Sequence, residues 1–240
     1  MTTYKTGVTP DAGIAARVVY YQTQIGPIVN AVKASTKGMI SRGPDRYTGE
    51  VPMGDLIADA QRWKGGTQIA FMNPGGIRAD IGPFASYPHD ITWTDFFAVQ
   101  PFDNKLATLT LTGSQIYALL EQQFAPTQSS MKLLQESGLV YSFNLSLPVG
   151  SRITSLTLTD GTPILSDATP YTVTCNEYIA TGGDGFSVFL SGTNLTRIGI
   201  SDLDALIEYV QFKYGVPPTN TPIDPTVYPK IEGRITNVTP

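Results

Sequence analysis

Alternating apolar and polar residues predict a series of β-strands along the chain. The clearest alternation runs over residues 105–112, with the sequence KLATLTLT. A short apolar run at residues 69–72 is typical of a buried strand. The same criteria predict further strands at residues 37–41, 140–145, 153–159, 171–175 and 230–238.

Apolar residues spaced three or four positions apart predict helices between these strands. Residues 12–33 follow this period, with Asp11 as the N-cap, and Pro27 predicts a kink or two consecutive helices. The period also predicts helices at residues 53–63, 94–99, 115–124 and 201–214. Since strands and helices are interspersed rather than strictly alternating, the expected fold is a mixed α/β (α+β) domain.

Length and composition favour an ordinary globular protein. The chain has 240 residues, of which 41% are hydrophobic and 15% are charged. One domain over residues 1–240 is expected, with irregular segments at residues 1–10 and 216–229. Its net charge of -4 and its lack of a basic run argue against nucleic-acid binding. No apolar stretch is long enough to predict a transmembrane helix.

Export from the cytoplasm is left open by the sequence pattern. The first residues, MTTYK, carry no signal-peptide pattern. Low charge together with abundant threonine, glycine and proline is compatible with a secreted protein. Among the locations left open, a secreted, periplasmic or cell-surface one is the expectation.

The chain contains few side chains that could bind a metal ion or act as a nucleophile. His89 is the only histidine and Cys175 the only cysteine. Hydrolytic di-metal centres use several histidine and aspartate ligands, so no metal site is expected in this chain. Cys175 is expected to be a small buried hydrophobic residue, and Asp55 and Asp59 are expected on a solvated helix face.

A glycine turn after the 69–72 strand is the first candidate for chemistry. Asn73 is followed by Pro74, then by Gly75 and Gly76, which let the backbone approach a ligand closely, and two residues later by Arg78. A guanidinium forms paired hydrogen bonds with phosphate oxygens, and an amide both donates and accepts. The turn is either an anion-binding site or a surface turn with a solvated arginine.

A second glycine turn, TGGDGF at residues 181–186, ends in an aromatic ring. Phe186 either borders a pocket or packs in the core. Phe102 lies in a predicted loop, and two loop rings can stack on both faces of a flat heterocycle. Asp184 is expected to fix the turn through hydrogen bonds to the backbone.

These segments together resemble the C-terminal domain of the 5'-nucleotidase family. The similarity covers residues 73–80, 91–102 and 176–186, and residues 54–60 are similar to the helix that opens that domain. It extends from about residue 8 to residue 238 in the order and spacing of the family. It implies a layered α/β/β/α domain.

The resemblance also implies a division of labour between two domains. An N-terminal metallophosphoesterase domain, absent from these 240 residues, would hold two divalent metals such as zinc or manganese. This chain would then bind a nucleotide or nucleoside: Phe102 and Phe186 would sandwich the base, and Arg78 would contact the phosphate. Asn73, the one catalytic candidate, would lie near the reacting phosphate, beside Gly75 and Gly76. The chain alone is expected to be inactive in hydrolysis.

Three departures from the family pattern keep other functions open. Pro74 replaces a small residue, and Gly49 occupies the expected position of a second arginine, with Arg42 and Arg46 only nearby. An acidic residue expected beyond the second ring is absent, since Ser191 and Gly192 lie there. One alternative is a non-catalytic binding or surface-interaction module that keeps the fold without nucleotide use. The other, an independent enzyme using Cys175 or His89, is disfavoured by the lack of partner groups.

Overall fold

The structure is a computed structural model that describes residues 9, 11–125 and 130–240. Its α-helices are α1 (Ala12–Val29), α2 (Pro52–Gly65), α3 (Trp93–Val99), α4 (Gly113–Gln122), α5 (Glu177–Ala180) and α6 (Asp202–Tyr214). Its strands are β1 (Val32–Thr36), β2 (Ile69–Met72), β3 (His89–Thr92), β4 (Lys105–Thr112), β5 (Gln135–Ser137), β6 (Leu139–Phe143), β7 (Ile153–Leu158), β8 (Pro170–Asn176), β9 (Thr193–Ser201) and β10 (Ile235–Asn237). Short 3-10 turns are η1 (Pro74–Gly76), η2 (Gly183–Gly185) and η3 (Ser187–Ser191).

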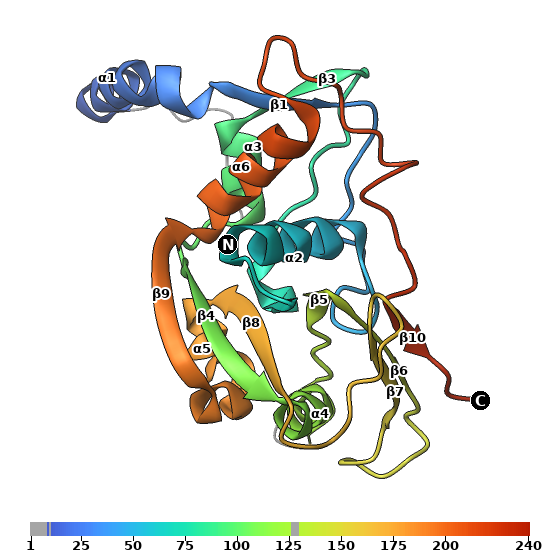
Figure 1. Cartoon of the computed structure of the whole chain (residues 1–240). Coiled ribbons are helices and arrows are strands. Elements are labelled where there is room, and N and C mark those ends of the chain that lie inside the picture. Colours follow the sequence, from blue (N-terminus) through green and yellow to red (C-terminus); the bar gives the residue numbers. More distant parts are fainter. Residues whose placement is uncertain (1–8, 10, 126–129) are drawn as a thin grey trace.

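A five-stranded mixed sheet lies at the centre of the molecule (Figure 1). Its order is β5-β2-β8-β4-β9, and β2 and β8 run parallel while the other neighbours run antiparallel. Phe71 of β2 lies opposite Cys175 of β8. Because parallel neighbours end at the same edge of a sheet, the residues after β2 and after β8 emerge side by side. That edge carries the candidate site.

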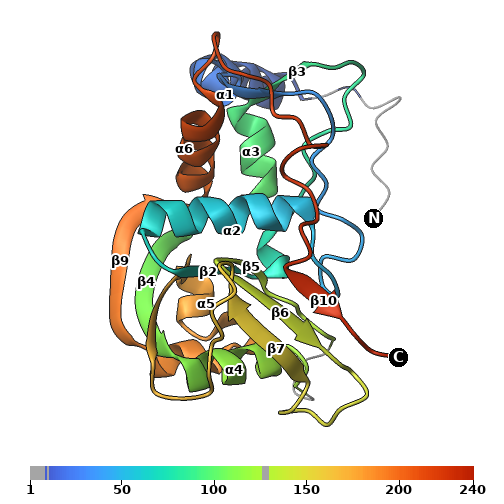
Figure 2. The same ribbon diagram turned by 45° about the vertical axis from the view of Figure 1, so that its right-hand side comes forward.

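The two faces of this sheet are covered by different layers. Ile69 and Phe71 of β2 belong to a hydrophobic cluster that includes residues of α4 and of the three-stranded sheet β10-β6-β7. Met72 belongs to a second cluster formed with α2, α3 and α6. Neighbouring residues of a strand point to opposite faces, so one short strand contributes to both clusters. Figure 2 shows α2 on one side of the sheet and α4 on the other. The predicted mixed, layered α/β architecture is confirmed.

Several local predictions were wrong, and for two strands the burial pattern shows why. Residues 32–36 form β1, paired with β3, rather than the end of a helix, and the predicted strand at 37–41 is reduced to a bridge between Ile40 and Ile81. The sequence pattern also missed β3, β5 and β9. β9 is an edge strand with mostly exposed side chains, and β5 is polar (Gln-Glu-Ser) yet buried, so neither shows apolar alternation.

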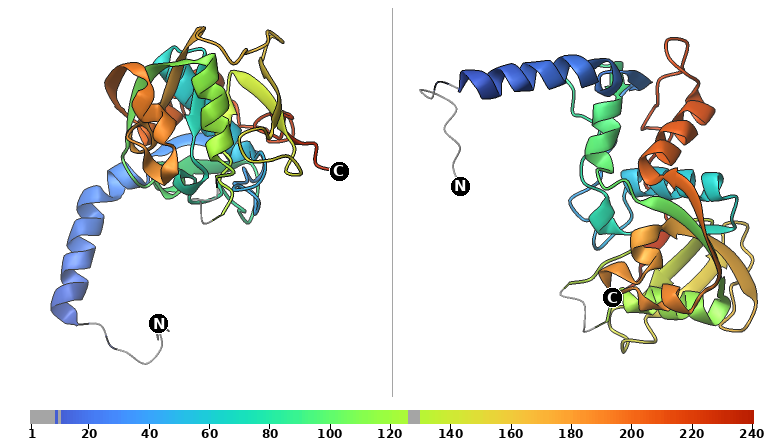
Figure 3. Two further views of the ribbon diagram at one scale, coloured as in Figure 1. Left: turned by 90° about the horizontal axis from the view of Figure 1, so that it is seen from below. Right: turned by 90° about the vertical axis from the view of Figure 1, so that its left-hand side faces the viewer.

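Helix α1 extends away from the rest of the domain, as Figure 3 shows. Asp11 caps it by accepting a hydrogen bond from the Ile14 amide at 2.9 Å, as predicted. Pro27 lies in its last turns. None of its side chains is buried by the residues that the structure describes, so its apolar positions do not join the core.

The expectation that Asp55 and Asp59 lie on a solvated face of α2 was also wrong. Asp55 is 1% exposed, and Asp59 forms two hydrogen bonds, of 2.8 and 3.0 Å, with the guanidinium of Arg234. Burial raises the pKa of Asp55 to about 10, although Arg234 at 4.0 Å acts in the opposite direction. Arg234 directly precedes β10, so this buried network ties the C-terminal segment to α2.

Candidate functional site

The first glycine turn sits at the end of β2, where the sheet edge meets solvent. Asn73 is 3% exposed and starts η1, and the amides of Gly76 and Ile77 donate to the carbonyls of Asn73 and Pro74 at 3.1 and 3.3 Å. A Cβ at Gly76 would lie 2.4 Å from the Met72 methyl and 3.1 Å from Asn73 Oδ1. Glycine at this position therefore lets the turn pack directly against the strand that it follows.

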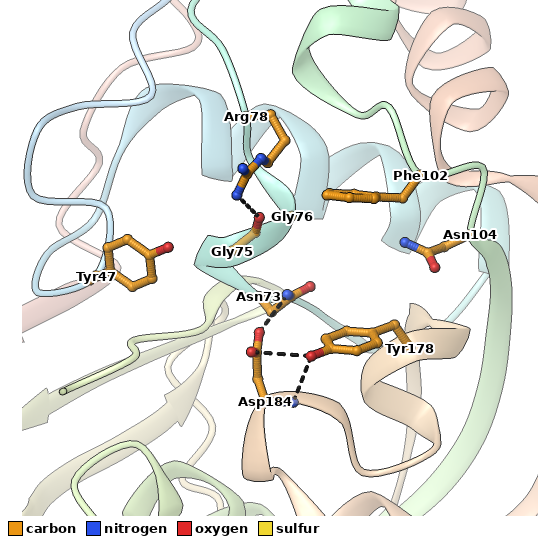
Figure 4. A pocket seen from close by; sticks show the side chains of 9 residues that line it. All are labelled: Tyr47, Asn73, Gly75, Gly76, Arg78, Phe102, Asn104, Tyr178 and Asp184. Carbon is orange, nitrogen blue, oxygen red and sulfur yellow. Dashed lines mark hydrogen bonds between the residues drawn. The ribbon is translucent and has the colours of Figure 1, made fainter. Parts of the chain in front are cut away.

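A cavity of about 500 Å³ opens beside this turn. It is lined by Tyr47, Asn73, Gly75, Gly76, Arg78, Phe102, Asn104, Tyr178 and Asp184 (Figure 4). Five of the six residues predicted for the site are thus brought together: Asn73, Gly75, Gly76, Arg78 and Phe102. Pockets of this size hold small organic ligands, and apolar rings mixed with a few polar groups are typical of them.

Two aromatic rings, Phe102 and Tyr178, line one end of the cavity, one above the other in Figure 4. Phe102 is 53% exposed and Tyr178 is 45% exposed, so each offers ring surface to a ligand. The Arg78 guanidinium carbon lies 5.7 Å from the centre of the Phe102 ring. A positive charge beside an exposed ring suits a ligand that is both flat and anionic.

Phe186 is the predicted site residue that the structure does not bring to the cavity. Its side chain is 0% exposed and packs in the same hydrophobic cluster as Phe189, Ile179 and Ala180. The reason is the path of η2: Gly182 and Asp184 adopt positive φ angles of 85° and 57°, which turn the chain so that residue 186 points inward. The sequence left two places open for Phe186, a pocket border and the core, and the structure shows it in the core.

Tyr178 takes the place expected for Phe186, and the sequence did not single it out. It lies on α5, which begins directly after β8. The parallel pairing of β2 with β8 puts residues 73 and 178 at one sheet edge. The sequence did offer one signal, since each of two buried strands is followed or ended by an asparagine, Asn73 and Asn176. The parallel pairing of these two strands, however, is not visible in the sequence.

Asp184 links the two glycine turns. Its carboxylate accepts hydrogen bonds from Asn73 Nδ2 at 2.7 Å, from the Tyr178 hydroxyl at 3.3 Å and from Lys132 Nζ at 3.3 Å. Its amide also donates to the Tyr178 hydroxyl at 3.2 Å. Asp184 therefore fixes side chains on both sides of the pocket, a larger role than the backbone contacts predicted from the sequence.

The hydrogen bonds of Asn73 limit what it can offer a ligand. Its Oδ1 accepts from Asn176 Nδ2 at 2.9 Å, while its own Nδ2 donates to Asp184. One N–H remains, which makes Asn73 a donor toward an anionic oxygen. Asn176 and Asp184 hold the amide in one orientation, and Gly75 beside it is half-buried and lines the cavity.

Asn104 brings a second amide to the ring end of the cavity (Figure 4). The backbone carbonyl of Asn104 accepts from the backbone amide of Asp202 at 2.8 Å, and its side-chain Nδ2 donates to Asp202 Oδ2 at 3.5 Å. Burial raises the pKa of Asp202 to about 7, so the hydrogen-bonding state of this neighbour changes near neutral pH. An amide next to two rings can donate to and accept from the edge of a heterocycle.

His89 and Cys175, the residues considered for an independent enzymatic activity, do not line the cavity. His89 stacks on Phe84 with ring centres 3.8 Å apart, on β3. Cys175 is buried in the central sheet, and burial raises the pKa of its thiol well above the ordinary range. Over residues 9, 11–125 and 130–240, no group of three or more His, Cys, Asp or Glu side chains could hold a metal ion. The one carboxylate lining the cavity, Asp184, is already bound by protein donors.

Comparison with known proteins shows which family the chain resembles. The model of the "5'-nucleotidase, C-terminal domain" family matches residues 25–191. The cell wall protein Lmo0130 of Listeria monocytogenes is 36% identical over 224 residues, which are 87% of this chain and 28% of that protein. The endonuclease YhcR of Bacillus subtilis is 32% identical over 208 residues, which are 85% of this chain and 16% of that protein.

Solved structures agree with this assignment. The 5'-nucleotidase precursor from Thermus thermophilus matches with a TM-score of 0.76 and 31% identity, over 95% of this chain and 44% of that one. The chain thus spans less than half the length of each of these relatives. Within the described part of the chain, no helix is long and apolar enough to cross a membrane.

Proposed function

The chain belongs to the 5'-nucleotidase C-terminal domain family, and from that premise we propose that it is the nucleotide- or nucleoside-recognition domain of a 5'-nucleotidase-type phosphohydrolase. The observation that carries the proposal is the cavity in which two exposed rings, Phe102 and Tyr178, stand beside Arg78 and the glycine turn. A flat base and an anionic phosphate are the two parts of a nucleotide, and the cavity offers a complementary surface to each.

The base is recognised by stacking. Each ring face contributes about 1–3 kcal/mol to the binding of a base, and stacking tolerates any base. Asn104 adds the edge contacts that distinguish one base from another. Tyr178, whose hydroxyl is held by Asp184, replaces Phe186 as the second ring in this proposal.

The phosphate is recognised at the glycine turn. Arg78 Nη1 donates to the Gly75 carbonyl at 3.2 Å, which fixes the guanidinium at the cavity that Arg78 lines. Asn73, whose amide has one N–H besides the one donated to Asp184, also lines the cavity (Figure 4). Charge-assisted hydrogen bonds from a fixed guanidinium are among the stronger contacts available to a phosphate oxygen.

Hydrolysis belongs, in this proposal, to a metallophosphoesterase domain that precedes this one in the parent protein. The donors lining the cavity do not suit two divalent cations, because the single carboxylate is engaged by Asn73, Tyr178 and Lys132. We place the parent protein outside the cytoplasm, in agreement with a relative named as a cell wall protein and with one named as a precursor. Phosphate release from AMP by this chain with added Mn²⁺ or Zn²⁺ should not exceed the blank, and metal-dependent turnover would contradict the division of labour.

A ligand titration tests the recognition role. Adenosine and AMP are titrated into the chain while the aromatic NMR signals are followed. Phe102→Ala and Tyr178→Ala should each weaken binding by about tenfold or more, given the value of a stacked face. Phe186→Leu, a conservative core change, is the matched control and should bind as the wild type does.

Two outcomes would contradict the proposal. If no signal moves at millimolar ligand, the chain is a binding or surface module of another kind, as Pro74 and Gly49 left open. If Phe186→Leu weakens binding while Tyr178→Ala does not, the pocket exists but the assignment of its second ring is wrong.

A further inference from the structure

Beyond the end of α2, the face of the central sheet that this helix covers carries uncovered threonine side chains. At Gly65 the helix packs directly on the sheet, because a Cβ there would collide with the hydroxyl of Thr174, which is buried. Thr172 lies on the same face and is exposed, opposite the half-buried Thr110 of β4. Figure 2 shows this end of α2 beside β4. A cavity of about 260 Å³ lies here, lined by Gly65, Gly66, Thr67, Thr108, Leu109, Thr110, Thr172 and Asn194.

Asn194 adds an amide to these hydroxyl groups because of a bulge in β9. The pairing of β9 with β4 shifts register between Thr108 and Thr110, and Asn194, at this bulge, has a φ of 57°. Asparagine tolerates this left-handed conformation, and bulges redirect side chains. Its Nδ2 donates to Thr110 Oγ1 at 3.3 Å. Within the described part of the chain, Asn194 Oδ1 has no donor and the Thr110 O–H has no acceptor, so the cavity offers both kinds of group to a ligand.

An exposed aromatic surface adjoins this cavity. A second cavity, of about 320 Å³, shares Gly66 and Thr67 with the first and is also lined by Asp59, Arg62, Trp63 and Tyr209. Trp63 is 37% exposed and stacks on Phe212, with ring centres 5.0 Å apart. Phe212 itself is 69% exposed. We call the two adjacent cavities the α2-end groove.

Arg62 gives this groove a positive charge that no protein group neutralises. In the part of the chain that the structure describes, every ion pair uses another cation. The carboxylate that lines the groove, Asp59, is bound by Arg234, and the neighbouring Lys64 pairs with Glu208. A guanidinium pairs with a carboxylate through two parallel hydrogen bonds. The groove therefore suits a ligand that brings its own carboxylate.

The α2-end groove is separate from the cavity at the first glycine turn. Thr67 precedes β2 and Asn73 follows it, so the two sites lie at opposite ends of this strand. No lining residue is shared between them. Ligands of the two sites should therefore not compete.

Hydroxyl groups, an amide, an exposed aromatic surface and a guanidinium together match an acidic sugar chain. Sugar hydroxyls both donate and accept, as threonine hydroxyls and amides do. The apolar face of a sugar ring can pack on an aromatic side chain, and a uronic acid carries a carboxylate for the guanidinium. Threonine is common in strands, so this residue type alone would not indicate a site. Its combination with Asn194 at a bulge and with the unpaired Arg62 does.

We propose that the α2-end groove binds an acidic oligosaccharide. Trp63 stacks on one sugar ring, and Arg62 pairs with the carboxylate of that sugar. Thr110, Thr172 and Asn194 bind hydroxyl groups of the next sugar. This site is independent of the proposed nucleotide-recognition function.

The two tryptophans of the chain provide the measurement, since each gives one indole N–H signal in an NMR spectrum. Tetragalacturonate, and maltotetraose as an uncharged tetramer, are titrated into the whole chain. Tetragalacturonate should shift the Trp63 signal, and maltotetraose should bind about tenfold or more weakly. Trp93 is the internal control: it also stacks on a phenylalanine, Phe97, with ring centres 5.0 Å apart, but it does not line the groove. Its signal should not move.

Three variants test the assigned contacts. Arg62→Gln should weaken the binding of tetragalacturonate by about tenfold or more and leave that of maltotetraose within about twofold. Lys64→Gln is the matched control, with the same loss of charge from the same helix, and should bind tetragalacturonate within about twofold of the wild type. Asn194→Gly suits the positive φ while removing the amide, and should weaken the binding of both tetramers by about threefold or more.

Several results would overturn the proposal. One is a Trp63 signal that moves with neither tetramer. Another is an equal loss in Arg62→Gln and Lys64→Gln, which would mean a general attraction between charges rather than a site. Equal affinity of the wild type for the two tetramers would contradict the pairing of Arg62 with a carboxylate. A Trp63 signal that AMP moves and tetragalacturonate does not would make the groove a nucleotide site instead.

Discussion

The two glycine turns share a Gly-Gly pair but present different kinds of side chain to the cavity. The turn at Asn73–Arg78 presents its charged side chain outward, and three of its residues besides Arg78 line the cavity. The turn at residues 181–186 buries its aromatic residue and contributes a carboxylate instead. Glycine permits a sharp turn, but packing decides which side chain then faces solvent. An aromatic residue after a glycine turn is therefore weak evidence for a stacking residue.

The largest effect should separate Phe186, the buried ring of the second turn, from Phe102, the exposed ring that lines the cavity beside the first turn. Phe186→Ala removes a fully buried ring and should lower the free energy of unfolding by about 3–5 kcal/mol. Phe102→Ala removes a half-exposed ring and should change it by less than about 0.5 kcal/mol. Urea denaturation measures both. Similar losses for the two variants would mean that the rings do not differ in burial as described.

A smaller effect on stability should come from replacing a glycine in each turn by alanine, because the space beside the two glycines differs. A Cβ at Gly183 would lie 2.5 Å from the Tyr178 carbonyl oxygen and 2.7 Å from its ring, whereas a Cβ at Gly75 meets nothing closer than 3.4 Å. Gly183→Ala should cost about 1–3 kcal/mol and displace Tyr178 from the cavity. Gly75→Ala is the control and should fold with nearly wild-type stability. A tolerated Gly183→Ala would show that α5 and η2 are packed less closely than in this structure.

The smallest effect is expected from the link between the turns. Asp184→Asn keeps the shape of the side chain but removes the charge that binds Lys132 and Asn73. Hydrogen bonds to a charged group contribute about 1.5–3 kcal/mol, and partial exposure of this one favours the lower figure. In a double-mutant cycle with Lys132→Met, the two changes should not be additive, because both remove the same pair. Additive losses would contradict the pairing.

The sequence predicted the first turn better than the second for a physical reason. The polar side chains of Asn73–Arg78 directly follow a short buried strand. The sequence therefore places them at a sheet edge, where the long side chain of Arg78 reaches solvent. At residues 181–186 the direction of Phe186 depends on the positive φ angles of Gly182 and Asp184 and on a cluster assembled from distant segments. Those contacts are not local, and no spacing in the sequence reports them.

Tyr178 and Asp184 illustrate the same limit. Their partner region at Asn73 is about a hundred positions away, and they meet it only because β2 and β8 pair in parallel. The mixed α/β layers were predictable, since β4, α2 and α6 each show a clean apolar period. β5 was not, because a buried strand of Gln, Glu and Ser has no apolar signal.

The most direct test of the account is to locate a bound nucleoside by intermolecular NOEs. Adenosine is added to the chain with its aromatic protons assigned, and contacts from the base protons are recorded. The account predicts NOEs from the base to the rings of Phe102 and Tyr178, and none to the ring of Phe186. NOEs to Phe186, or a bound base without contacts to Phe102 and Tyr178, would contradict it.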